Sequence, residues 1–240
     1  MKAQKNDSNV LILRGLSIVL IAFIVYSIWV LPSIISLKIL FIFIDLSKIS
    51  HLLLMPFVVV FEFFFVLLSE VIVTSLVINL FKLKYKEGVY DLNLKDKMFF
   101  RFTLASMLYL PINKTLELLC LTPFCQLYGK LAGAKIGENV LLVGRINDPC
   151  LTEIGDNCVI GGHSLISAHA GEKKLILKKV RIGNNCIVGG EAHIMPGVTM
   201  EEGSVLGAKS LATKNQVLEK GKIYGGVPAK EIKITKDRKL

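Results

Sequence analysis

Aliphatic residues recur at every sixth position through the second half of this chain. The pattern runs without interruption from Ile182 to Ala212, and it also joins Ile154, Ile160 and Ile166 upstream. Neither an α-helix, with its period of about 3.6, nor an ordinary strand, with its period of about 2, produces this spacing. A six-residue period predicts strand-and-turn units, three of which form one triangular coil with the aliphatic side chains inside. Successive coils then stack through parallel ladder hydrogen bonds.

Residues that tolerate a left-handed backbone follow the aliphatic positions at a fixed distance. Asn139, Asn157, Asn185 and Gly203 each lie three positions after an aliphatic residue of the series. Glycine and asparagine adopt a positive φ at low cost. We therefore expect these residues to form corners of the coils, with a structural role.

The six-residue period is broken once. Ile166 and Ile182 are sixteen residues apart, which is not a multiple of six. The segment Ala170–Lys179 is therefore expected to leave the coil as a loop before the repeat resumes. His169 stands at the root of this predicted loop.

The first third of the chain is much more apolar than the rest, so a net charge of +10 coexists with a mean hydropathy of +0.57. Val10–Leu31 is apolar except for Arg14 and a few small polar residues, and Pro32 is expected to close it. A second apolar segment is Leu52–Phe81. Each can cross a hydrocarbon core of about 30 Å. We expect two membrane spans, with Ile34–Ile44 either in the interface or continuing a tilted helix.

The flanking lysines predict how these spans are oriented. Cytoplasmic segments of membrane proteins are enriched in Lys and Arg. The connection between the spans carries less positive charge than the outer flanks, because Asp45 offsets part of it. Both ends of the chain are therefore expected in the cytoplasm. The outer lysines are Lys2, Lys5, Lys82, Lys84 and Lys86, and the connection has Lys38 and Lys48.

Two carboxylates interrupt the second apolar segment. Glu62 and Glu70 are two helical turns apart and fall near one face, where they either pair with lysines, line a polar path or pack between helices. Beyond them, Met98–Leu110, followed by Pro111, and Thr115–Leu127 are apolar runs that predict helices in or near the membrane surface.

The five cysteines do not predict a disulfide framework or a zinc site. Their number is odd and no CxxC pair is present, so reduced cytoplasmic thiols are expected and no metal is expected. Cys158 and Cys186 occur in the same repeat context and are expected in the core. The others are Cys120, Cys125 and Cys150.

Three stretches of the chain resemble the hexapeptide-repeat acyltransferases, which include galactoside, maltose and xenobiotic acetyltransferases. They read TEIGDNCVIGGHSLISAHAG, VRIGNNCIVGGEAHIMPGVTMEEGSVLGAKSLATK and YGGVPAK. The resemblance implies a left-handed parallel β-helix and acyl transfer. The preceding segments, FKLKYKEGVY and LTPFCQLYGKLAGAKIGENV, resemble the membrane-associated C-terminal modules of epsilon-poly-lysine synthetases.

The resemblance implies roles for particular residues. His169 matches the catalytic histidine, whose imidazole takes a proton from the acceptor. Gly190 matches the residue whose backbone N–H stabilises the oxyanion. Asp148 resembles an acidic position of the synthetase modules and is expected to bind substrate or to orient the histidine. The implied coenzyme contacts are Ala208, Thr213, Lys214, Gly226, Pro228 and Lys230.

Each of these assignments has a plainer alternative. Lys209, Lys214 and Lys230 are also compatible with solvated surface charges, and the run KEIKITKDRK with a tail facing solvent or anionic lipid. His163 and His193 are expected to be structural. A metal enzyme resembling the gamma-class carbonic anhydrases would use three histidines, but the order of spacings among the histidines here differs from that family.

Together these features predict a membrane-anchored acyltransferase with four regions. Residues 1–86 form a helical anchor, 87–135 membrane-proximal helices, 136–230 the β-helix and 231–240 a basic tail. Acyl-CoA, expected to be acetyl-CoA, would donate to a hydroxyl or amine of a membrane-associated or cell-surface acceptor. The alternatives are an amide-forming module fed by a carrier protein or partner synthetase, and a non-catalytic scaffold. A homotrimer is expected, and no nucleic-acid partner.

Overall fold

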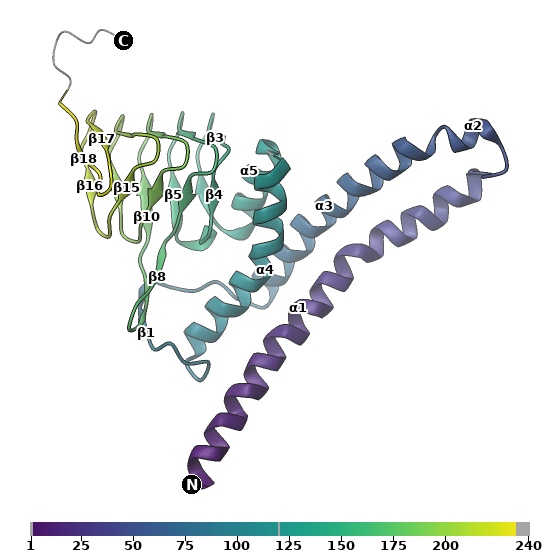
Figure 1. Cartoon of the computed structure of the whole chain (residues 1–240), viewed down its shortest axis with the longest axis horizontal. Coiled ribbons are helices and arrows are strands. Elements are labelled where there is room, and N and C mark those ends of the chain that lie inside the picture. The colour runs from purple at the N-terminus through teal and green to yellow at the C-terminus, as the bar shows by residue number, and fades with distance from the viewer. Residues whose placement is uncertain (1, 120, 234–240) are drawn as a thin grey trace.

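The computed structural model describes residues 2–119 and 121–233, with side chains from Val10 onwards. Cys120, the side chains of Lys2 and Lys5, and most of the predicted basic tail, 231–240, lie outside the described residues. The helices come first in the chain and the β-helix second (Figure 1).

Two long helices form a hairpin that extends away from the β-helix (Figure 1). They are α1 (Lys2–Phe43) and α3 (Met55–Leu80), joined by the short α2 (Ile49–Leu52). The segments Val10–Phe43 and Ile49–Leu80 are long and apolar enough to cross a membrane, and only 28% and 17% of their most apolar stretches are buried. Two such segments match the number expected from the sequence.

Two prolines that were expected to lie outside helices are inside them. Pro32 does not close the first apolar segment, because α1 continues to Phe43, and Pro111 lies within α4 (Lys97–Leu119). A proline removes one backbone hydrogen bond, whereas ending the helix leaves a full turn of carbonyls without donors. In α4 the carbonyl that Pro111 frees belongs to Met107, and the Tyr26 hydroxyl of α1 donates to it at 2.6 Å.

The carboxylates of α3 are buried against the other helices. Glu62 accepts a hydrogen bond from the Ser33 hydroxyl of α1, and Glu70 is also buried. Of the three expectations for these residues, packing between helices is the one that the Ser33 contact favours.

The second half of the chain consists of three parallel sheets, and successive strands pass from one sheet to the next. The first sheet contains β2 (Lys135–Ile136), β5 (Thr152–Ile154), β10 (Val180–Ile182), β13 (Thr199–Met200) and β16 (Val217–Leu218). The second contains β3 (Leu141–Leu142), β6 (Val159–Ile160), β11 (Ile187–Val188), β14 (Val205–Leu206) and β17 (Ile223–Gly225), with the antiparallel β18 (Lys230–Glu231) at its end. The third contains β4 (Arg145–Ile146), β7 (Leu165–Ile166), β12 (His193–Ile194) and β15 (Leu211–Ala212). Three strands therefore make one coil, as the six-residue period predicts.

The interior of the β-helix is filled by the periodic aliphatic residues. Every aliphatic residue of the series, from Ile154 to Ala212, is buried, and Cys158 and Cys186 are buried beside them as predicted. The expected corners are also found, since Asn139 and Asn185 have φ of 53° and 57°. The four described cysteines, Cys125, Cys150, Cys158 and Cys186, are free thiols.

Helix α5 (Thr122–Ala132) covers the first coil. It packs on β2 and β3, and the Gln126 side chain donates a hydrogen bond to the Val140 carbonyl. The end of a β-helix exposes both apolar interior and unpaired strand edges, and a terminal cap protects them. The helical half is thereby fixed to the β-helix (Figure 1).

The interruption of the repeat is a β-hairpin that leaves the coil between β7 and β10. Its strands are β8 (His169–Gly171) and β9 (Leu175–Leu177), so the predicted loop at Ala170–Lys179 is confirmed. A third strand comes from a distant part of the chain, because β1 (Gly88–Tyr90) pairs antiparallel with β9. The hairpin is therefore held by the segment that connects α3 to α4.

Candidate active site

The root of the hairpin holds a histidine and a buried carboxylate in direct contact. His169 begins β8, and its Nδ1 lies 2.7 Å from Oδ2 of Asp148. Asp148 is completely buried, whereas 29% of the His169 side chain remains exposed. Asp148 precedes the short 3-10 helix η1 (Pro149–Leu151), which turns the chain at the end of the first coil.

Asp148 is held by hydrogen bonds on both carboxylate oxygens. The Tyr85 hydroxyl donates to Oδ1 at 2.6 Å, and the backbone N–H of Ala168 donates to Oδ2 at 2.8 Å. The Thr152 hydroxyl donates to the Asp148 backbone carbonyl at 2.9 Å. Such partners replace the hydrogen bonds to water that a buried carboxyl group loses. Burial, followed by the charge of Asp148, raises the pKa of Tyr85 well above its usual value, so Tyr85 remains a donor.

This carboxylate determines the protonation of His169. Burial by itself lowers the pKa of His169, but the hydrogen bond and the charge of Asp148 outweigh it, so the pKa lies above its ordinary value of 6.5. When the imidazole is neutral, its Nδ1 proton is the one donated to Asp148, because an ionised carboxylate is only an acceptor. The lone pair is then on Nε2. Phe102 of α4 packs edge-on against the ring, with centroids 4.9 Å apart.

The other histidines have different surroundings. His163 is an exposed corner residue with φ of 57°, and its Nδ1 lies 3.7 Å from Oε1 of Glu117. Burial, then the nearby charges of His169 and Arg145, lower the pKa of His193 in β12. Among the described residues, no group of three His, Cys, Asp or Glu side chains is arranged to hold a metal ion.

The residues implied by the resemblance lie along two edges of the triangular β-helix. Gly190 and Ala208 occupy successive turns from the second sheet to the third, and Gly226 follows β17 on the same edge, where its carbonyl accepts a hydrogen bond from the Leu211 N–H. The coils approach closely there, because a Cβ on Gly189 would lie 2.3 Å from the Ala208 nitrogen. Thr213 and Lys214 occupy the turn from the third sheet back to the first, and His169 begins the hairpin that leaves the coil between the same two sheets. One chain therefore does not bring His169 and Gly190 to the same edge.

The lysines of the two edges differ in their contacts. Lys214, which follows β15, forms an ion pair with Glu172 at the tip of the hairpin. This ion pair joins the coil that ends with β15 to the hairpin that begins at His169. Lys209 lies 3.7 Å from Glu191 with both side chains largely exposed, as a solvated surface charge would. Pro228 precedes Ala229, whose N–H donates to the Leu211 carbonyl at 2.8 Å, so the chain folds back over the last coil before exposed Lys230.

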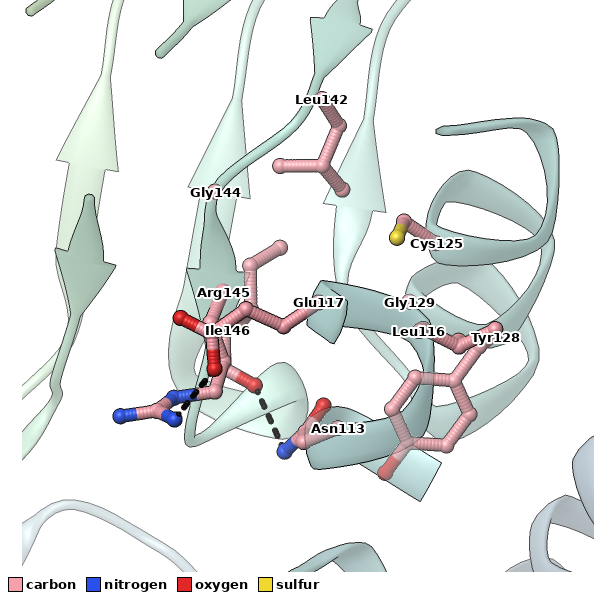
Figure 2. A pocket seen from close by; sticks show the side chains of 10 residues that line it. All are labelled: Asn113, Leu116, Glu117, Cys125, Tyr128, Gly129, Leu142, Gly144, Arg145 and Ile146. Atoms are coloured by element: carbon pink, nitrogen blue, oxygen red, sulfur yellow. Dashed lines mark hydrogen bonds and ion pairs between the residues drawn. The ribbon is translucent and has the colours of Figure 1, made fainter. Parts of the chain in front are cut away.

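A small pocket where the helices meet the first coil is shown in Figure 2. Arg145 Nη1 lies 2.8 Å from Glu117 Oε2, and the Asn113 amide donates to the Ile146 carbonyl at 3.4 Å. Its volume of about 20 Å³ is room for little more than one water molecule. The pocket is a packing junction between α4, α5 and β4, and the His169 site lies elsewhere.

Sequence reasoning missed two residues of the site, Tyr85 and Phe102. Tyr85 is 63 positions from Asp148, and Phe102 lies in a run read only as an apolar helix. Neither residue belongs to the hexapeptide period. The only signal was that Tyr85 falls within FKLKYKEGVY, a segment already singled out by resemblance.

The repeat region of the chain matches a known family model. The family model described as the hexapeptide repeat of succinyl-transferase matches residues 152–173 and 179–208. This match lies within the β-helix and covers less than half of the chain, and the predicted left-handed parallel β-helix is confirmed. No curated protein matches the chain in sequence.

Solved structures that resemble part of this chain include transferases. A hexapeptide-repeat acetyltransferase from Vibrio cholerae, also solved with acetyl coenzyme A, is 23% identical over 44% of this chain and 65% of its own, with a TM-score of 0.39. A hexapeptide transferase family protein from Anaplasma phagocytophilum is 28% identical over 43% of this chain and 57% of its own, with a TM-score of 0.35. An N-acyltransferase from Bacillus cereus, in complex with dTDP and 3-hydroxybutyryl-CoA, is 21% identical over 44% and 74%, with a TM-score of 0.38. The chain spans less than two thirds of the first two, and at these TM-scores the similarities carry no argument about activity.

Proposed function

We propose that this chain is a membrane-anchored acyltransferase that moves an acyl group, expected to be acetyl, from acyl-CoA to a hydroxyl or amine. The observation that carries the proposal is the contact between His169 and buried Asp148 at the root of a hairpin that leaves a hexapeptide-repeat β-helix. The match to the hexapeptide-repeat family model supports the same class of reaction.

His169 is proposed as the general base. Nε2 takes the proton of the acceptor hydroxyl or amine while the acceptor oxygen or nitrogen attacks the thioester carbonyl. The C–S bond then breaks, the coenzyme leaves as a thiolate, and the imidazolium returns the proton to it. Asp148 is proposed to orient the imidazole and to stabilise its charged form, because both of its oxygens already have partners inside the chain. Contact with substrate, the other expectation for Asp148, is less compatible with its complete burial.

Completion of the site is proposed to need a second copy of the chain. Gly190, whose backbone N–H is proposed to stabilise the oxyanion, lies on a different edge from His169. In a cyclic trimer, one edge of each β-helix meets a different edge of its neighbour. The proposed coenzyme contacts Ala208, Gly226 and Pro228 would then approach His169, Thr213 and Lys214 of the adjacent subunit.

Attachment to a membrane is supported by the surface of the helical hairpin. Its two apolar segments are mostly exposed, whereas the core helix of a soluble protein would be mostly buried. The flanking lysines support a topology in which both ends and the β-helix are cytoplasmic. The proposed acceptor is accordingly membrane-associated or on its way to the cell surface.

The topology can be tested directly. A reporter joined after Leu240 is expected to score as cytoplasmic, and a second reporter placed in the connection near Ser47 as external. Scoring of the Leu240 fusion as external would reject an even number of spans with cytoplasmic ends.

Replacement of the proposed base tests the reaction. His169→Ala is expected to lower turnover by about 10²- to 10⁴-fold, the usual contribution of general-base catalysis. Binding of acyl-CoA and the thermal unfolding midpoint should change little, because the core consists of the periodic aliphatic residues. His163→Ala, at an exposed corner, is the matched control and should retain activity. A loss below about threefold in His169→Ala would exclude a base at this position.

A further inference from the structure

An open pocket with positively charged walls lies where the helical hairpin meets α4. Its volume is about 530 Å³. The residues that line it are Arg14, Ser17, Leu83, Lys97, Phe100 and Arg101. Arg14 comes from α1, Leu83 from the segment after α3, and the others except Ser17 from α4. Two helices, α1 and α4, therefore place three cationic side chains around one space, and no acidic residue lines it.

Two of these cations are available to an anion. Arg14 Nη1 donates to the Leu94 carbonyl at 2.6 Å, which fixes its position. Lys97 and Arg101 are four residues apart on the same face of α4, are exposed, and form no ion pair with the residues that the structure describes. The carboxylate nearest to them in sequence belongs to Asp96. It accepts hydrogen bonds from the backbone N–H groups of Met98 and Phe99 at 2.6 and 3.1 Å, at the start of α4.

A second, apolar pocket of about 450 Å³ adjoins the first. The two share Leu83 and Phe100, and the second continues between α1, α3 and α4. Its lining is entirely apolar and includes Val25 and Ile28 of α1, Val77 of α3 and Leu104 of α4. A polar pocket that continues into an apolar groove is complementary to an amphipathic ligand with an anionic head.

The position along the helices agrees with such a ligand. Arg14 lies near the start of the first apolar segment, Val10–Phe43, and Leu83 lies just after the end of the second, Ile49–Leu80. The charged pocket is therefore at one end of the hairpin, where the proposed membrane would meet the cytoplasm. The groove runs from there toward the interior of the proposed membrane.

We propose that Arg14, Lys97 and Arg101 bind the phosphate of an anionic lipid whose hydrocarbon chain occupies the adjoining groove. The proposal rests on the proposed membrane attachment but not on acyl transfer. Lipid binding here also touches the candidate active site through one helix, because α4 carries Phe100 in the groove and Phe102 against His169. A bound lipid would fix α4, and with it the packing of the His169 ring, at the membrane surface.

The test uses the full-length chain purified in mild detergent, with bound ligand counted by native mass spectrometry. The probes are phosphatidic acid, diacylglycerol with the same acyl chains, and inorganic phosphate. Phosphatidic acid is expected to be retained, diacylglycerol to bind at least about tenfold more weakly, and inorganic phosphate at equal concentration not to displace the lipid. Equal retention of diacylglycerol, or complete displacement by inorganic phosphate, would overturn the proposal.

A pair of charge variants separates a built site from general attraction to anionic lipid. Lys97→Ala with Arg101→Ala should weaken binding of phosphatidic acid at least about tenfold. Lys82→Ala with Lys86→Ala removes the same charge from exposed residues that do not line the pocket, and should change it less than about twofold. Equal losses in the two variants would show a diffuse electrostatic effect and reject the site.

A third variant tests the groove while leaving the cations in place. Ile28→Trp fills part of the groove and should reduce retention of phosphatidic acid several-fold, whereas Ile35→Trp, on an exposed part of the same helix, should not. Full retention in Ile28→Trp rejects the proposed chain position. Resistance of the chain to alkaline carbonate extraction is measured in parallel. Extraction would contradict membrane attachment, whereas a membrane-bound chain that fails to retain phosphatidic acid would contradict the lipid site alone.

Discussion

At the scale of single residues, the candidate site is a chain of hydrogen bonds that runs from the interior to a partly exposed ring. Tyr85 donates to Asp148, which accepts from His169 in turn. Complete burial strengthens the effect of the carboxylate on the imidazole, because less water screens it. The same carboxylate that fixes the Nδ1–H tautomer also raises the pKa of His169.

Asp148→Asn tests this link through the pH dependence of kcat/KM. A general base works when neutral, so activity of the native chain should rise as the pH passes the raised pKa of His169, above 6.5. Without the carboxylate, only burial acts on His169, and burial lowers its pKa. The acid limb of the kcat/KM profile should therefore move to a pH below 6.5. The plateau should also drop by about 10²- to 10⁴-fold, because an amide no longer fixes the tautomer.

The matched control is Asp91→Asn, an exposed carboxylate paired with Lys174 on the surface. It should leave both the acid limb and the plateau of the kcat/KM profile unchanged.

The raised pKa of His169 also has a consequence for the stability of the fold. Protonation of His169 stabilises the fold fully below 6.5, and this contribution is lost as the pH rises through the folded-state value. If the acid limb of the kcat/KM profile stays at the same pH in Asp148→Asn, the carboxylate of Asp148 does not raise the pKa of His169.

At the scale of elements, the coils stack closely enough that particular corners admit no side chain. Gly189→Ala places a Cβ 2.3 Å from the Ala208 backbone nitrogen, so the coils must separate locally. We expect a loss of about 1 to 3 kcal/mol, typical of overpacking, and a lower thermal midpoint in detergent. Gly171→Ala is the control, because nothing lies within 4 Å of its added Cβ. Equal midpoints for the two variants would contradict close stacking at this edge.

The hairpin is the element in which long-range contacts matter most. Its strands β8 and β9 are sequence neighbours, but the third strand, β1, comes from the segment after α3. The same segment delivers Tyr85 to Asp148. The segment between α3 and α4 therefore completes both the sheet above His169 and the hydrogen-bond chain that reaches it.

At the scale of the whole molecule, the division of the proposed site between two edges predicts complementation between subunits. His169→Ala and Ala208→Trp should each be inactive alone. In mixed trimers assembled at random from equal amounts, about a quarter of the interfaces would pair an intact His169 edge with an intact Ala208 edge. Recovery of roughly that fraction of native activity is expected, with light scattering in detergent reporting the trimer. No recovery in confirmed mixed trimers would place the whole site within one chain.

The sequence by itself determined the β-helix, its corners and the place where the hairpin leaves it. These features are local, because each six-residue unit carries its own aliphatic residue and corner residue, as at Ile182 and Asn185. It also determined the two apolar segments by length and composition. The continuation of helices through Pro32 and Pro111 was not evident, because it depends on contacts such as Tyr26 with Met107.

Only the tertiary structure decided what surrounds His169. Asp148 and Phe102 are 21 and 67 positions from it in the chain, and no period links them. Their meeting depends on how α5 caps the first coil and how α4 packs against it, and both depend on the shape of side-chain packing. The charged pocket arises in the same way, since Arg14 and Arg101 line one space only when α1 and α4 are packed together. Residues adjacent in sequence determine the repeat, whereas the candidate site consists of residues distant in sequence that tertiary packing brings together.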